Sequence, residues 1–178
     1  MRAMIITVVA VSISVSAEAQ ESPFHAGPLI PDYGHIATIE NRDAIPKKAR
    51  FRIAYDVTKQ AEAGTLNRAF VTPARFLNMH AEAGVDPKRM SLAVVIHGGA
   101  VKDLLNAERY AEEVGGENVN APLIAELREH GVEFIVCGQS AAYQGIVTED
   151  LLPGVRMSLS AMTAHALLQQ DGYTLNPF

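Results

Sequence analysis

Apolar and polar positions along the chain predict β-strands that alternate with helices. The segment 51–57 (FRIAYDV) alternates between the two kinds of residue, which is typical of a strand. The runs 91–97 and 132–137 are continuously apolar, and this pattern indicates strands that are covered on both faces. Shorter strands are expected at 155–158 and 173–175.

Helices are expected between these strands. For the segment 66–83 two starts are possible: Thr72 caps a helix with Pro73 in its first turn, or the helix begins near Leu66 and Pro73 kinks it. Further helices are expected at about 101–114, from an Asn120 cap to 130, at 138–145, and from a cap at 158 or 160 to about 170. The alternation predicts a three-layer α/β/α domain with a mostly parallel sheet of about five strands.

The N-terminus has the pattern of a secretory signal peptide. One positive charge precedes the uncharged apolar run 5–16, and the small-x-small sequence AEA follows at 17–19. The apolar run is shorter than the roughly 20 residues that span a bilayer. We therefore expect cleavage after Ala19, a periplasmic or secreted mature chain that begins at Gln20, and no membrane association after cleavage.

Residues 20–50 are rich in proline and are expected to form an extended arm that packs over the domain or over a neighbouring subunit. Within this arm the stretch 35–39 (HIATI) is a candidate for a short edge strand. The remaining residues, 51–178, are assigned to one α/β domain.

Charge and cysteine content narrow the possible functions. The net charge is −5, and no stripe of Lys and Arg is present, which argues against binding to nucleic acid or to anionic membranes. A single cysteine, Cys137, excludes an intramolecular disulfide, so this residue is a buried apolar group, an intermolecular partner or a reactive thiol. The six histidines lack metal-ligand spacing, and we predict neither a metal site nor a cofactor.

Three strand ends carry polar or reactive side chains: Asp56, His97 and Cys137. Ligands of open α/β sheets bind beyond the carboxyl ends of the strands. If the three strands are parallel neighbours, these side chains meet at one edge of the sheet and form the predicted site.

Cys137 has the strongest chemical case within this predicted site. It precedes Gly138 and a helix start, where backbone N–H groups stabilise a thiolate, and His97 is a candidate for proton transfer. Gln139 and Ser140 are candidates to contact a ligand, although Ser140 is also a natural helix cap. The competing interpretation is that Cys137 packs as a small buried apolar residue.

The other candidates admit structural explanations as well. Gly98 and Gly99 either allow close approach of an anion or form a tight turn. His97 either acts in the site or bonds a neighbouring loop, and Asp56 either orients His97 or caps its strand. His165, which lies in the middle of the last helix, is interpreted as a core or interface residue.

Three segments together resemble the DsrE/DsrF-like family, and in particular its exported single-domain members. They are LAVVIHGGAVKDLL (92–105), NAPLIAELREHGVEFIVCGQSAAYQGI (120–146) and DLLPGVRMSLSAMTAHALLQQDGY (150–173). The resemblance covers residues 51 to the C-terminus. It implies a three-layer α/β/α fold, assembly into homo-oligomers such as trimers or hexamers, and a cysteine at the position of Cys137 that carries sulfur as a persulfide between partner proteins.

Three hypotheses for function follow. In the first, Cys137 accepts sulfane sulfur from a donor protein and passes it to an acceptor protein or a small thiol. In the second, the domain is a non-catalytic oligomeric module whose crevice binds a small ligand while Cys137 only packs. In the third, Cys137 is a redox sensor that is reversibly oxidised.

Overall fold

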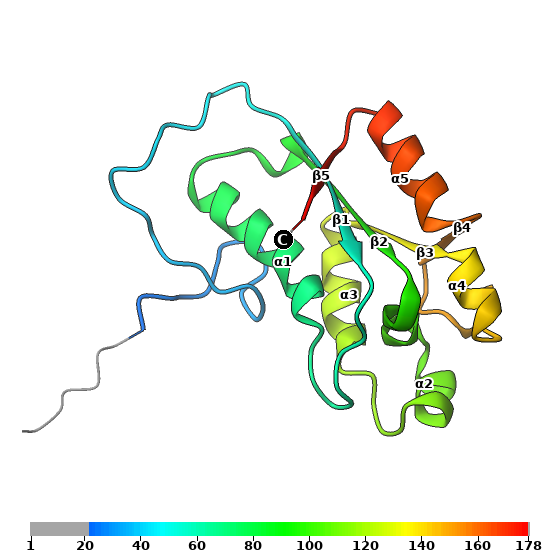
Figure 1. Cartoon of the computed structure of the whole chain (residues 1–178). Helices are drawn as coiled ribbons and strands as arrows, with labels where there is room; N and C mark the ends of the chain where they lie inside the picture. Colours follow the sequence, from blue (N-terminus) through cyan, green and yellow to red (C-terminus); the bar gives the residue numbers. More distant parts are fainter. Residues whose placement is uncertain (1–21, 178) are drawn as a thin grey trace, which may run out of the picture.

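The computed structural model describes residues 22–177 (Figure 1). The predicted signal peptide, 1–19, lies outside these residues. Within the described part of the chain, no helix is long and apolar enough to cross a bilayer.

The core of the fold is a five-stranded sheet in the order β4-β3-β2-β1-β5. Every pair of neighbouring strands is parallel. The strands are β1 (Phe51–Val57), β2 (Met90–Ile96), β3 (Glu133–Cys137), β4 (Arg156–Ser158) and β5 (Thr174–Asn176). The predicted parallel α/β fold is thus confirmed, and the three strand ends that carry Asp56, His97 and Cys137 do belong to neighbouring strands.

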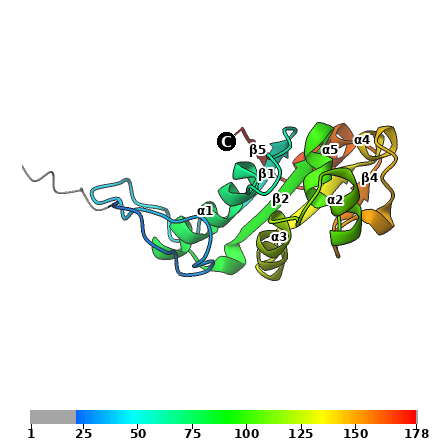
Figure 2. The ribbon, with the colours of Figure 1, turned by 90° about the horizontal axis from the view of Figure 1, so that it is seen from below.

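Helices cover both faces of this sheet (Figure 2). The larger cluster of buried side chains lies between one face and helices α1 and α3, and the smaller cluster lies between the opposite face and α5. The helices are α1 (Arg68–Glu82), α2 (Ala107–Glu113), α3 (Asn120–Glu129), α4 (Gly138–Tyr143) and α5 (Ala161–Gln170). Because successive strand residues point to opposite faces, the sequence of each strand determines which side chains meet α5.

Helix α1 settles the choice between the two predicted starts. Its cap is Asn67, whose side chain accepts a hydrogen bond from the Ala69 N–H, and Pro73 lies inside the helix rather than in its first turn. The start near Leu66 was therefore the correct alternative. Pro73 is buried within the helix, as are Phe70 and Leu77, which pack into the main core.

Three local predictions were wrong. The stretch 101–114 forms a 3₁₀ segment, Gly98–Leu104, followed by the short helix α2, rather than one helix. Asn120 is the first residue of α3 instead of its cap: its own N–H donates to the Asn118 side chain, and its side chain accepts a hydrogen bond from the Asn67 N–H. The stretch 35–39 adds no strand to the sheet; Ile36 only forms an isolated antiparallel bridge with His25.

Asn78 of α1 holds the N-terminal arm against the domain. Its side-chain oxygen accepts hydrogen bonds from the Leu29 and Ile30 N–H groups at 3.1 and 2.9 Å. Its amide nitrogen donates to the carbonyls of Ile30 and Tyr33 at 2.9 and 3.0 Å. Ile30 and Ile36 of the arm are fully buried. The arm is thus held against the domain by two buried isoleucines and by hydrogen bonds between its backbone and one buried amide.

Candidate functional site

The predicted site residues lie on one face of the sheet. Asp56, His97 and Cys137 alternate in phase with Ala54, Ala93 and Ile135, whose side chains pack toward α5. The register that pairs Ile96 with Val136 brings the residues that follow, His97 and Cys137, to neighbouring positions at the carboxyl edge. The sheet topology therefore places all three under the start of α5, which could not be read from any one segment of sequence.

Asp56 bridges two histidines. Its Oδ1 atom lies 3.1 Å from His97 Nε2 and 2.7 Å from His165 Nε2. The sequence predicted only a packing role for His165, but the structure places this α5 side chain, only 15% exposed, in the site. Its phase gave a signal: in α5 it follows Ala161 by one turn, on the face that also carries the buried Ala164 and Leu168.

The geometry of the two histidines defines their tautomers when they are neutral. Both Nε2 atoms face a carboxylate, which only accepts hydrogen bonds, so each Nε2 carries the proton and each Nδ1 keeps a lone pair. His165 Nδ1 is buried without a hydrogen-bond partner among the described residues. Each neutral ring therefore keeps one nitrogen, Nδ1, as a hydrogen-bond acceptor.

The histidines also act on Asp56. Burial raises the pKa of the Asp56 carboxyl. Hydrogen bonds from His165 and His97, and the positive charge of these rings when protonated, lower it by more, so the pKa lies below its ordinary value. Asp56 is therefore a carboxylate at neutral pH and is suited to orienting both rings. This is the orienting role that the sequence allowed for Asp56.

Cys137 lies where two helices begin. It is 6% exposed, and the backbone N–H groups of Gln139 and Ser140 in α4 and of Ala161 in α5 act to lower the pKa of its thiol. The Ser140 hydroxyl, which also acts to lower the pKa of this thiol, accepts a hydrogen bond from the Gly98 N–H at 3.1 Å. Ser140 thus links the Gly98 turn to the thiol, and it does not cap α4 with its side chain.

These donors change the acidity of the thiol. Burial raises the pKa of Cys137, whereas the hydroxyl of Ser140 and the N–H groups of Ser140, Ala161 and Gln139 together lower it more, so that the pKa lies below its ordinary value. The environment consequently favours the thiolate, which is the nucleophilic form of cysteine.

Glycine at position 138 allows this arrangement. A Cβ atom at Gly138 would lie 2.7 Å from the Ser158 carbonyl oxygen, closer than side-chain atoms approach backbone. The absence of a side chain lets the chain that leads into α5 approach Cys137. Gly98 has φ +57° and forms a tight turn against the Thr58 carbonyl, so the structural interpretation of this glycine is the one that the geometry supports.

Two open pockets flank the cluster at the carboxyl edge. One, of about 430 Å³, includes Asp56, Lys59 and Arg68 in its lining. The other, of about 470 Å³, is lined by Gly98, Gly99, Gln139, Ser140, Tyr143 and Gln144. Cys137 lines neither pocket, but the second lies over the residues that donate to its sulfur. Among the described residues no group of three or more histidine, cysteine or acidic side chains has the geometry of a metal site.

Comparisons with known proteins place this geometry in context. The family model of the DsrE/DsrF-like family matches residues 52–177. A protein of unknown function from Methanobacterium thermoautotrophicum, MTH1491, has a similar structure, with a TM-score of 0.54 and 19% sequence identity over 72% of this chain and 99% of the other. The YchN protein from E. coli is similar with a TM-score of 0.51 and 17% identity, over 72% and 100% of the two chains. Among curated proteins none matches.

Proposed function

The chain belongs to the DsrE/DsrF-like family, and from this premise we propose that Cys137 carries sulfur as a persulfide. The observation that carries the proposal is the set of donors around the sulfur. One hydroxyl and three backbone N–H groups stabilise a thiolate at this otherwise apolar position. A cysteine that only fills space needs no such donors, because the neutral thiol packs as a small apolar group.

The proposed transfer is a thiol exchange without net oxidation. The Cys137 thiolate attacks the outer sulfur of a donor persulfide, R–S–SH. A sulfur–sulfur bond forms at Cys137 while that of the donor breaks, and R–S⁻ leaves with the electron pair. In the second step an acceptor thiolate attacks the outer sulfur of the Cys137 persulfide, and Cys137 leaves as the thiolate. Stabilisation of the thiolate favours its departure in this second step.

His97 transfers the proton in this proposal. Its Nδ1 lone pair accepts the proton of the Cys137 thiol, and the resulting imidazolium protonates the departing R–S⁻. Asp56 holds the ring through Nε2 and stabilises its positive charge, and His165 fixes Asp56 from α5. His97 is therefore assigned the acid–base role, and Asp56 and His165 are positioning residues.

The small exposed fraction of Cys137 restricts the donor. Because only 6% of the residue is exposed and Cys137 lines neither flanking pocket, a donor must present a narrow end group, such as a terminal persulfide, unless α4 moves. The adjoining pocket, whose lining includes Gln139 and Ser140, offers space for the remainder of a donor. Exposed apolar side chains near this end of the sheet support the predicted self-association or docking of a partner protein: Tyr143, Leu159 and Met162.

The test combines thiol reactivity with intact mass. The rate of alkylation of Cys137 by iodoacetamide is measured against pH, and the protein is weighed before and after treatment with polysulfide. We expect a thiol that titrates below the ordinary cysteine pKa and a gain of one sulfur atom that a small thiol removes. A thiol that reacts only after unfolding would refute the proposal.

Variants separate the assigned roles. Ser140→Ala should raise the pKa of the thiol, because one donor to the thiolate is lost. His97→Gln should slow sulfur uptake, whereas His130→Gln, at an exposed position outside the site, should change neither property. Cys137→Ser provides the blank for mass and alkylation. Equal behaviour of His97→Gln and His130→Gln would remove His97 from the mechanism.

The burial of Cys137 also supports a second candidate function, namely non-catalytic binding of a small ligand. In this case the pocket over Gly98, Gly99, Gln139 and Ser140 holds the ligand, and the thiol only packs. The same experiment distinguishes the two functions, because a thiol that is inert in the folded protein is the result that ligand binding alone requires. Reversible oxidation of Cys137 without sulfur uptake would instead favour a redox sensor.

A further inference from the structure

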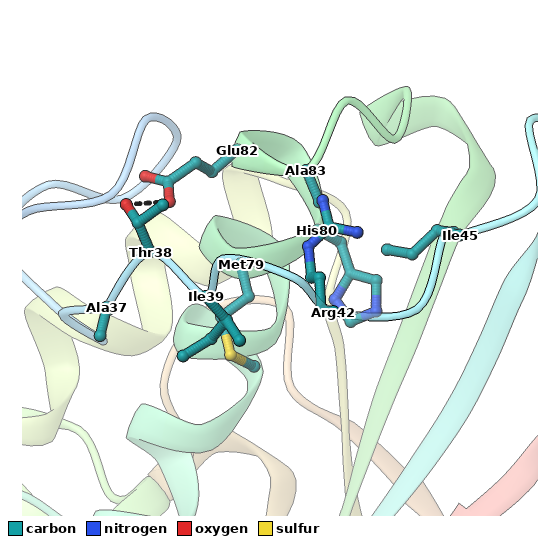
Figure 3. A pocket seen from close by; sticks show the side chains of 9 residues that line it. All are labelled: Ala37, Thr38, Ile39, Arg42, Ile45, Met79, His80, Glu82 and Ala83. Atoms are coloured by element: carbon teal, nitrogen blue, oxygen red, sulfur yellow. Dashed lines mark hydrogen bonds between the residues drawn. The ribbon is translucent and has the colours of Figure 1, made fainter.

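A further pocket lies away from the candidate site, between the N-terminal arm and the C-terminal end of α1 (Figure 3). Its volume is about 260 Å³. The arm contributes one wall and the last turns of α1 contribute the other. The lining residues are Ala37, Thr38, Ile39, Arg42, Ile45, Met79, His80, Glu82 and Ala83.

The walls of this arm pocket are mainly apolar. Ile39 is 62% exposed and Met79 is 42% exposed, so apolar surface remains open to water where the arm meets α1. The His80 ring stacks on Phe76 with a centroid distance of 3.8 Å, and its Nδ1 atom donates to the Phe76 carbonyl. This fixes the ring as part of a rigid wall. A chain of methylene groups in the pocket would cover apolar surface that the protein itself leaves exposed.

The charged groups of the arm pocket are not equivalent. Both carboxylate oxygens of Glu82 are already bonded, Oε2 to His25 Nε2 at 2.7 Å and Oε1 to the Thr38 hydroxyl at 3.1 Å. Arg42 donates to the backbone carbonyl of Asp43, and no carboxylate within residues 22–177 pairs with its guanidinium. Figure 3 shows Arg42 beside His80 and Ile45, while Glu82 and Thr38 bond each other. The cation that remains available to a ligand is therefore Arg42.

We propose that the arm pocket binds a small carboxylate with an apolar tail, whose carboxylate pairs with Arg42 and whose tail lies against Ile39, Ile45 and Met79. Guanidinium groups bind carboxylates through paired N–H donors, which gives the charged end a defined position. The pocket is smaller than the roughly 300–1,000 Å³ of sites for drug-sized ligands, so the tail is short. The site is independent of the chemistry proposed for Cys137.

Chain length provides the first test. Calorimetric titration of the purified protein with butanoate, hexanoate and octanoate should show one saturable site. Affinity should rise about fourfold for each added methylene that is buried, as follows from roughly 0.8 kcal/mol per CH₂. Octan-1-ol has the same tail without the charge and should bind about fivefold more weakly than octanoate, since an exposed ion pair contributes up to roughly 1 kcal/mol.

Two variants test the two halves of the pocket. Arg42→Gln should weaken octanoate about fivefold and leave octanol unchanged. Ala83→Leu should fill the cavity and abolish the binding of both compounds. The matched controls are Arg50→Gln, at an exposed position of the arm, and Ala125→Leu, at an exposed position of α3. Both controls should bind octanoate as the parent protein does, and circular dichroism checks that every variant is folded.

Each possible result bears on the proposal. A length-dependent affinity that Arg42→Gln and Ala83→Leu reduce, and that the controls retain, supports it. The absence of saturable binding, equal affinity for octanol and octanoate, or octanoate binding that survives Ala83→Leu would overturn it.

Discussion

Replacing Asn78 with alanine tests how the N-terminal arm is held. The side chain of Asn78 is fully buried and makes five hydrogen bonds to the arm backbone. Four of them, of 2.9 to 3.1 Å, join it to Leu29, Ile30 and Tyr33, and a longer one of 3.3 Å reaches the Gly34 carbonyl. No other described side chain bonds these backbone groups. The substitution removes the bonds while leaving the arm sequence itself unchanged.

The expected cost follows from these four bonds. At about 1 kcal/mol each, they contribute about 4 kcal/mol to the free energy of unfolding. Alanine in the middle of α1 regains roughly 0.5 kcal/mol through its higher helix propensity. The loss is limited because the arm can detach instead. Detachment lets water bond the freed backbone groups, but it exposes Ile30 and Ile36, which costs roughly 1.5–3 kcal/mol each. We therefore expect a loss of about 3 kcal/mol.

Urea denaturation measures this loss, and limited proteolysis with trypsin locates it. The arm carries Arg42, Lys47 and Lys48, so trypsin should cut the variant there faster than the parent protein. Asn106→Ala is the matched control, since the Asn106 side chain makes only two hydrogen bonds, one as the cap of α2 and one to the Glu149 carbonyl, and its loss should cost about 1–2 kcal/mol.

A destabilisation by Asn78→Ala of less than about 1 kcal/mol, or one no larger than that of Asn106→Ala, would contradict this reasoning. Unchanged cleavage in the arm would do so as well. Either result would mean that the apolar contacts of Ile30 and Ile36 hold the arm without the amide.

Two further predictions concern Asp103 and Gly138. Burial raises the pKa of Asp103, although the Ala61 N–H and Asn67 side chain lower it, so its charged form is less favourable in the folded protein than in the unfolded chain. As pH falls from neutral through the raised pKa toward the ordinary value of 3.8, the parent protein should therefore gain stability relative to Asp103→Asn. Urea denaturation measures this difference in stability, and a difference that does not vary with pH would refute the argument. Gly138→Ala should destabilise the fold by roughly 1–3 kcal/mol through its clash with Ser158 and should raise the pKa of Cys137. Gly99→Ala, whose added Cβ atom would meet its nearest neighbour at 3.6 Å, should be much milder in thermal unfolding, and equal losses would contradict the packing argument.

The strands were predictable because burial on two faces demands continuous apolar sequence. β2 and β3 were found within one residue of their ends from the runs at 91–97 and 132–137. The segment before α2 was mistaken for part of one helix, because its apolar residues pack against the core from a 3₁₀ turn that has no distinct periodicity in sequence. The candidate edge strand at 35–39 failed for another reason: an apolar stretch only forms a strand where a partner offers free backbone groups.

The candidate site was predictable only in part. Asp56, His97 and Cys137 stand at strand ends, and a parallel sheet gathers its strand ends at one edge. His165 was missed because its helical phase indicates only that it lies on the buried face of α5, whereas its contact with Asp56 spans 109 positions of sequence. The Ala161 N–H, which helps to stabilise the thiolate, was missed because backbone donors leave no trace in residue identity.

The sequence by itself determined the five strands of the sheet, most of the helices, the positions of the glycines and the presence of one cysteine at a strand end. These features follow from local physics, namely apolar periodicity, backbone conformation and caps. Only the tertiary structure decided that His97 and His165 share one carboxylate, that two helices begin at Cys137, and that the arm forms a pocket with α1. Those contacts depend on strand order and on the approach of α5 and the arm, which are global consequences of burying the core.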